Sequence, residues 1–146
     1  METLADTQHK VVEIKMTYLP DFRQNSLPSV GYSCDAYNYV SHVHNWRADE
    51  MIVYCLLFNQ KGKLLGVIPF QPGTLPTLNS IYTRALVSSA VSIILATFRH
   101  DKLPNEQDLK LAKRLQETSK LLDIRLLDCI YFNMIGYYSL LDEDKL

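Results

Sequence analysis

Two apolar runs constrain the fold of this chain more than any other feature. Residues 51–59 (MIVYCLLFN) and 91–98 (VSIILATF) are rich in aliphatic and β-branched side chains and carry no charge. Continuous runs of this kind are typical of strands that are buried on both faces of a sheet. We therefore expect an α/β fold in which helices cover both faces of the sheet that contains these two strands.

Three segments with apolar residues at helical spacing supply the helices. They span residues 33–44, 76–90 and 104–123, and Ser33 is the expected N-cap of the first. The residues expected on the buried faces are Ala36, Tyr39, Val40 and Val43 in the first helix, Ile81, Ala85 and Leu86 in the second, and Leu111, Ala112, Leu115, Ser119 and Leu122 in the third.

The remaining strands complete a mixed sheet. Residues 64–70 follow a turn centred on Gly62 and are expected to pair with residues 51–59, with Pro69 indicating a sheet edge or a strand end. Residues 125–133 and 136–141 are expected to form a closing hairpin. The order strand, helix, hairpin, helix, strand, helix, hairpin predicts a mixed α/β domain with three layers.

Length and composition limit the class of protein. The 146 residues suggest one domain over residues 31–146, preceded by an N-terminal extension over 1–30 with one strand at 11–19 (VVEIKMTYL). The net charge of -1 argues against a broad nucleic-acid footprint, although a local basic patch remains compatible with it. No apolar run reaches the ~18 residues of a membrane helix, and the first residues lack the apolar core of a secretory signal. We expect a cytoplasmic protein without a membrane segment.

The His and Cys residues do not form a recognisable catalytic or metal motif. His42 and His44 are two residues apart, a spacing that puts ligands on one face only in a strand, whereas they lie near the end of a predicted helix. Cys34, Cys55 and Cys129 are an odd number without a CxxC pair, so we expect free thiols in a reducing compartment. Cys55 and Cys129 fall in buried strand patterns and are expected to act as small apolar side chains.

Several segments resemble one known family. DAYNYV, LLFNQKGKLLG, PGTLPTLNSIYTRAL, SIILA, DLKLAKRLQETSKLLDIRLLDCIYF and GYYSLLDE occur in this order from Ser33 onward. In their order and spacing the chain resembles the RadC-like branch of the JAB/MPN (JAMM) family, most specifically in SIILA, KLLDIRLLD and GYYS. The resemblance implies the three-layer fold of the cytidine-deaminase type. It also associates the chain with bacterial DNA-repair proteins and mobile elements.

The zinc motif of that family is degenerate here. In the family, His-x-His-Pro and then Ser-x-x-Asp follow the IILA stretch; both His and the Asp bind zinc, and an upstream Glu activates zinc-bound water. The resemblance puts Thr97 and Arg99 at the two His positions and leaves Asp108 in place. It puts Met51 at the Glu position. Glu50 is one residue out of register, so only a bulge would return its side chain to that face.

Asp108 also has a structural explanation. Asn105 is a good N-cap, and Asp108 lies three residues later, where a carboxylate can complete a capping box and favour the helix dipole. Thr97 and Arg99 alternate onto one strand face, where the family's ligands point. We predict that Arg99 pairs with Asp108 and occupies the former metal site. The alternative is an exposed Arg at a strand end.

The resulting functional hypothesis is a RadC-like JAB domain that has lost its zinc centre. It would be a binding or scaffold domain rather than an enzyme, with no cofactor and with a protein or nucleic-acid partner. A second hypothesis is a zinc-dependent hydrolase with displaced ligands, drawn from His100, Asp101 and Asp108, with Cys129 as an outside candidate. His100 follows Arg99, so it should face away from the site.

A third hypothesis is a single-stranded nucleic-acid binder whose groove combines basic and aromatic residues. An ordinary solvated helix face is the commoner explanation of such basic residues. The candidates are Arg84, Arg99, Lys102, Lys110, Lys113 and Arg114, with Tyr82 and Phe98 for base stacking.

Overall fold

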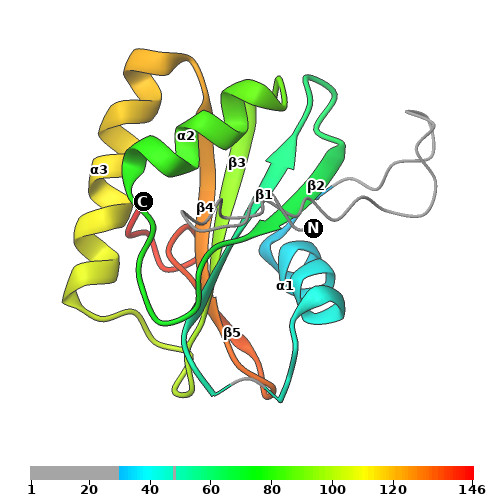
Figure 1. The fold of residues 1–146 in the computed structure, drawn as a ribbon, viewed down its shortest axis with the longest axis vertical. Helices are drawn as coiled ribbons and strands as arrows, with labels where there is room; N and C mark the ends of the chain where they lie inside the picture. The colour runs from blue at the N-terminus through cyan, green and yellow to red at the C-terminus, as the bar shows by residue number, and fades with distance from the viewer. Residues whose placement is uncertain (1–29, 48) are drawn as a thin grey trace, which may run out of the picture.

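A single mixed sheet of five strands forms the centre of the molecule. The computed structural model describes residues 30–47 and 49–146. The strands are β1 (Ile52–Phe58), β2 (Leu64–Pro69), β3 (Ser92–Phe98), β4 (Arg125–Phe132) and β5 (Tyr137–Ser139). Their spatial order is β2-β1-β3-β4-β5 (Figure 1). β3 and β4 are parallel, and all other neighbours are antiparallel.

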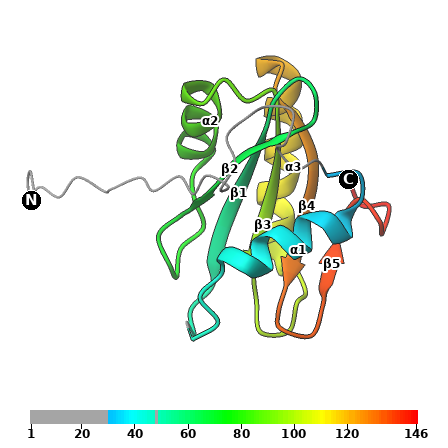
Figure 2. The same ribbon diagram turned by 90° about the vertical axis from the view of Figure 1, so that its right-hand side faces the viewer.

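Helices cover both faces of this sheet. α1 (Ser33–Val43) lies on one side, and α2 (Leu78–Val87) and α3 (Glu106–Leu122) lie on the other (Figures 1 and 2). The two sides are called the α1 face and the α2/α3 face below. This arrangement confirms the mixed α/β fold with three layers.

Alternating side chains of the central strands fill the two cores. In β1, Val53, Cys55 and Leu57 pack under α2 and α3, whereas Tyr54 and Leu56 pack under α1. Every residue of β1 and β3 is buried, as the two apolar runs predicted. All odd-numbered core residues of β3 lie on the α2/α3 face, and this parity determines where the end of the strand points.

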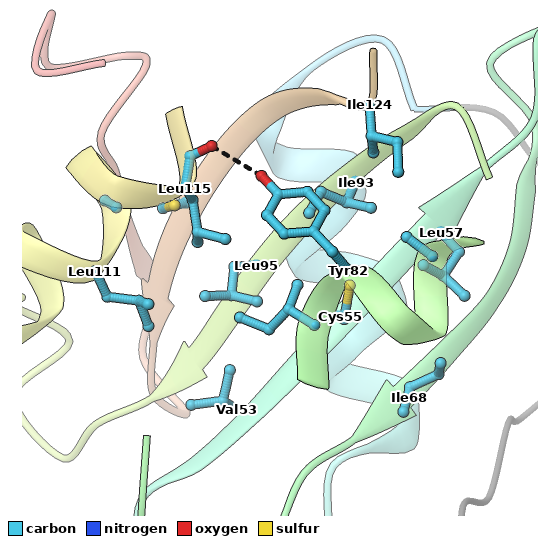
Figure 3. Close-up of a cluster of buried hydrophobic side chains, with 14 of the residues drawn as sticks. Val53, Cys55, Leu57, Ile68, Tyr82, Ile93, Leu95, Leu111, Leu115 and Ile124 are labelled. Atoms are coloured by element: carbon cyan, nitrogen blue, oxygen red, sulfur yellow. Dashed lines mark hydrogen bonds between the residues drawn. The ribbon is translucent and has the colours of Figure 1, made fainter. Parts of the chain in front are cut away.

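Tyr82 joins the two helices of the α2/α3 face. Its hydroxyl donates a hydrogen bond of 2.8 Å to the carbonyl of Leu115, and the ring packs in the apolar cluster (Figure 3). The hydroxyl also lies 2.6 Å from the Oγ atom of Ser119. A buried tyrosine usually needs such partners for its hydroxyl. Ile81 and Ala85 are buried as predicted, and Tyr82 rather than Leu86 completes the buried face of α2.

Several details of the helices differ from the sequence prediction. Leu86 is 59% exposed and Leu122 is 40% exposed, because both lie at helix ends beyond the core. Ser33 is the first residue of α1 rather than its N-cap, which is Tyr32. The carboxylate of Asp35 accepts hydrogen bonds from the amides of Gly31 and Tyr32, so it satisfies this helix start.

The turns and edges of the sheet agree with the prediction. Gly62 has a φ of 73° in the turn between β1 and β2, a conformation that favours glycine. β2 ends at Pro69 and is an edge strand. The strand expected over 11–19 lies outside the described residues. Among the helices of residues 30–47 and 49–146, none combines the length and the hydropathy needed to cross a membrane.

Candidate functional site

The candidate site lies where β3 ends and α3 begins. β3 ends at Phe98 in the middle of the sheet, between β1 and β4, and the amide of Arg99 still donates to the carbonyl of Phe132. Thr97 is 2% exposed and pairs with Val53 on one side and Tyr131 on the other. The parity of β3 directs Thr97 and Arg99 toward the α2/α3 face, where the first turn of α3 lies.

Arg99 and Asp108 form a bidentate ion pair, as predicted. The Nε atom of Arg99 donates to Oδ2 of Asp108 at 2.6 Å, and Nη2 donates to Oδ1 at 2.8 Å. The Arg99 side chain is 19% exposed, and the Asp108 side chain is 1% exposed. The hydrogen bond with Asp108 raises the pKa of Arg99 above its usual value. Two parallel charge-assisted hydrogen bonds fix the guanidinium plane as well as its charge.

The same carboxylate caps α3. Oδ2 of Asp108 accepts the amide of Asn105 at 3.0 Å, and Oδ1 of Asn105 accepts the amide of Asp108 at 2.9 Å. The capping box predicted from the sequence is therefore present. Asp108 accepts three hydrogen bonds in all, two from Arg99 and one from the backbone, and these occupy both of its oxygens.

Met51, rather than Glu50, faces the same side as the ion pair. The paired register of β1 and β3 begins at Ile52 and Phe98 and runs without a shift, so Glu50 and Met51 lie just before the paired part of β1. Met51 packs against the core of the α2/α3 face and lines an open hollow of about 390 Å³ together with Arg99. Glu50 is exposed, and its Oε2 atom lies 2.8 Å from where a Cβ atom on Gly73 would be.

His100 and Asp101 have other partners. The Nε2 atom of His100 donates to the carbonyl of Asp49 at 2.8 Å, and Oδ1 of Asp101 accepts the amide of Leu103 at 3.2 Å. Cys129 is buried, and burial raises the pKa of its thiol. Within the described ranges, no group of three or more His, Cys, Asp and Glu side chains could hold a metal ion. The donor set does not fit a zinc ion with three protein ligands.

His42 and His44 point in different directions. Nδ1 of His42 donates to the carbonyl of Asn38 at the surface, whereas His44 is 5% exposed and its Nδ1 lies 2.7 Å from the hydroxyl of Tyr54. The His44 ring lies against Phe98, with a centroid distance of 4.4 Å, and burial lowers the pKa of His44. This aromatic cluster was not predicted, because its members come from three separate elements.

The pH dependence of stability is expected to report on His44. Its pKa in the folded chain lies below the ordinary value of 6.5, so below that pH the unfolded chain binds more protons than the folded one. The free energy of unfolding should therefore fall as the pH drops from about 6.5 toward the folded pKa. Urea unfolding between about pH 5.5 and 7.5 should show this slope.

The control variant is His44→Phe, which keeps a ring beside Phe98 and removes the titrating group. Its slope over the same pH range should be flatter than that of the wild-type chain. Equal slopes in the two proteins would rule out His44 as the source.

Asp128 is a buried carboxylate that was not predicted from the sequence. Its oxygens accept from the Ser139 hydroxyl at 2.6 Å and from the amides of Cys129 and Leu141 at 2.7 and 3.1 Å. Burial raises the pKa of Asp128. The available signal was one acidic residue inside the apolar run of β4. The contacts show that Asp128 connects β4 to the last residue of β5 and to the segment that follows it.

The aromatic half of the predicted nucleic-acid groove is wrong. Tyr82 is 3% exposed and Phe98 is 6% exposed, so neither ring is available to stack on a base. Arg99 is already paired with Asp108. The other basic candidates include Lys110 and Arg114, which line a groove considered below.

The fold and this strand-to-helix site define an α/β domain of the JAB type. The chain belongs to the RadC-like JAB domain family, whose sequence model matches residues 31–146. It is 31% identical over 98 residues to a UPF0758 protein of Syntrophotalea carbinolica, covering 62% of this chain and 43% of the relative. It is 32% identical over 101 residues to a UPF0758 protein of Clostridium acetobutylicum, covering 64% and 44%. The alignments thus span less than half the length of these curated relatives.

Proposed function

We propose that this RadC-like JAB domain is a non-catalytic binding or scaffold domain without a zinc centre. The observation that carries the proposal is the bidentate pair of Arg99 and Asp108. The guanidinium stands beside the carboxylate that the family resemblance assigns to zinc. The partner of the domain would be a protein or a nucleic acid, in line with the resemblance to bacterial DNA-repair and mobile-element proteins. The cysteine pattern favours the cytoplasm as the location.

The chemistry of the site supports this proposal. An arginine remains protonated at any physiological pH, so it repels a cation that approaches the same carboxylate. Zinc binding would require Arg99 to leave Asp108, and neither Arg99 nor Thr97 is a zinc ligand. The thioether of Met51 neither accepts nor donates a proton at physiological pH, so Met51 cannot replace the carboxylate that activates water. Each of these three residues disfavours hydrolysis independently of the others.

Zinc content tests the proposal. The purified chain should contain substoichiometric zinc by elemental analysis, both as isolated and after incubation with excess zinc followed by desalting. Its melting temperature should be the same in chelator as in buffer, because no metal stabilises the fold. Stoichiometric zinc that Asp108→Ala abolishes would overturn the proposal and favour the hydrolase with displaced ligands.

A further inference from the structure

We propose that a groove between the start of α2 and the outer side of α3 binds an acidic peptide segment that carries an apolar side chain. The groove has a volume of about 370 Å³. Leu75 and Leu78 line one wall, and Leu111, Lys110 and Arg114 line the other. It lies outside the ion-pair site, and no acidic or aromatic residue lines it.

The apolar part of the groove is incompletely covered. Leu75 and Leu78 are half-buried and pack against the core of the α2/α3 face, where Leu111 is 9% exposed. Figure 1 shows the segment before α2 running alongside α3 on this side of the sheet. Half-buried leucines at the wall of a groove leave apolar surface that one side chain of a partner can cover.

No acidic residue lines the charged part of the groove, although Glu106 and Glu117 lie about one helical turn beyond Lys110 and Arg114 on α3. Lys110 and Arg114 are four residues apart, so they lie one turn apart on the same side of α3. Between residues that the structure describes, the ion pair found is that of Arg99 and Asp108, and no side-chain hydrogen bond involves Lys110 or Arg114. Two adjacent positive charges repel each other, and a carboxylate between them relieves this repulsion.

These features favour a peptide over a nucleic acid as the occupant. A single strand of nucleic acid binds along a basic track with exposed aromatic rings, whereas this groove has only two cations and no aromatic residue. Its volume is that of a site for one or two side chains rather than for a row of bases. An acidic residue next to a leucine or a similar apolar residue satisfies both the two cations and the apolar wall.

This inference rests on the binding role proposed above, because it names the kind of partner that a binding domain of this family would hold. Its test is separate, because zinc content tests the ion-pair site whereas peptide binding tests only the groove. A chain that binds zinc and the peptide would overturn the first proposal and support the second.

The experiment is fluorescence anisotropy of the full chain with a labelled peptide, acetyl-Asp-Glu-Leu-Leu-Asp-Glu. The matched probe is acetyl-Lys-Lys-Leu-Leu-Lys-Lys. We expect the acidic peptide to bind at least about 10-fold more tightly than the basic one, and we expect its binding to weaken as salt is added. Lys110→Ala combined with Arg114→Ala should weaken it by about 10-fold.

The control variant is Lys113→Ala, which removes an exposed positive charge from α3 that does not line the groove. It should leave the affinity within about 2-fold of the wild type, as expected for a distant exposed charge. All of these side chains are exposed, so each variant should keep the wild-type melting temperature.

Equal affinity for the two peptides, or equal effects of the groove and control variants, would overturn the proposal. So would a labelled oligothymidine that binds more tightly than the acidic peptide and depends on Lys110 and Arg114.

Discussion

Asp108→Ala is expected to lower the free energy of unfolding by about 3 kcal/mol. The substitution leaves the Arg99 guanidinium unpaired in a site where its side chain is only 19% exposed. It also removes the acceptor that satisfies the amide of Asn105 at the start of α3, and loss of a cap costs about 1 kcal/mol. The partial exposure of Arg99 allows water to replace some of the lost contacts, which places the value at the lower end of the range for a broken buried pair.

Urea unfolding of a double-mutant cycle measures this ion pair. The variants are Arg99→Met, Asp108→Asn and their combination; asparagine keeps an oxygen that can accept the amide of Asn105. Each single variant leaves one charge without its partner, so the combination should be more stable than the sum of the single effects predicts, by about 1–3 kcal/mol. Additive effects within about 0.5 kcal/mol would show that the two side chains do not stabilise each other.

The sequence predicted those parts of the molecule that depend on short-range patterns. β1 and β3 were evident because each is apolar on both faces, which only a covered central strand permits. The prediction of the Arg99 and Asp108 pair combined two local rules with the family resemblance, which put both residues at the metal site of the family. Strand alternation set the direction of Arg99, and the spacing of Asn105 and Asp108 placed a carboxylate in the first turn of the next helix.

Features that depend on contacts between distant segments were not predictable. Leu86 fits the helical spacing of α2 but lies at its end, and Tyr82 is buried instead because Leu115 and Ser119 receive its hydroxyl. Likewise, the groove next to α3 exists because the segment near Leu75 packs beside a helix more than thirty residues later in the chain. No local sequence pattern encodes such a tertiary contact, since it depends on how the helices pack on the sheet.

The substitution pair Thr97→His with Arg99→His is expected to give this chain a zinc site at the end of β3. Residues 97 and 99 alternate onto the same face, so the two imidazoles would approach Asp108, whose carboxylate is freed when the guanidinium is removed. Two His and one Asp supply three ligands and leave a fourth position for water. Elemental analysis should find about one zinc per chain, and zinc at 100 times its Kd should stabilise the variant by about 2.7 kcal/mol.

Two further variants separate a designed ligand set from adventitious binding. Adding Asp108→Asn to the double variant should abolish stoichiometric zinc, because a neutral amide is a much poorer zinc ligand than a carboxylate. Arg99→His alone should bind more weakly, since Thr97 contributes no ligand. Thr97 is 2% exposed, and the larger imidazole will cost about 1–3 kcal/mol through overpacking, so circular dichroism must first show that the variant is folded.

A folded double variant that takes up no zinc would mean that this end of β3 does not correspond to the metal site of the family. Even a loaded variant should hydrolyse nothing while Met51 stands where the carboxylate base is needed, and Met51→Glu added to the loaded variant is the change that would supply that base.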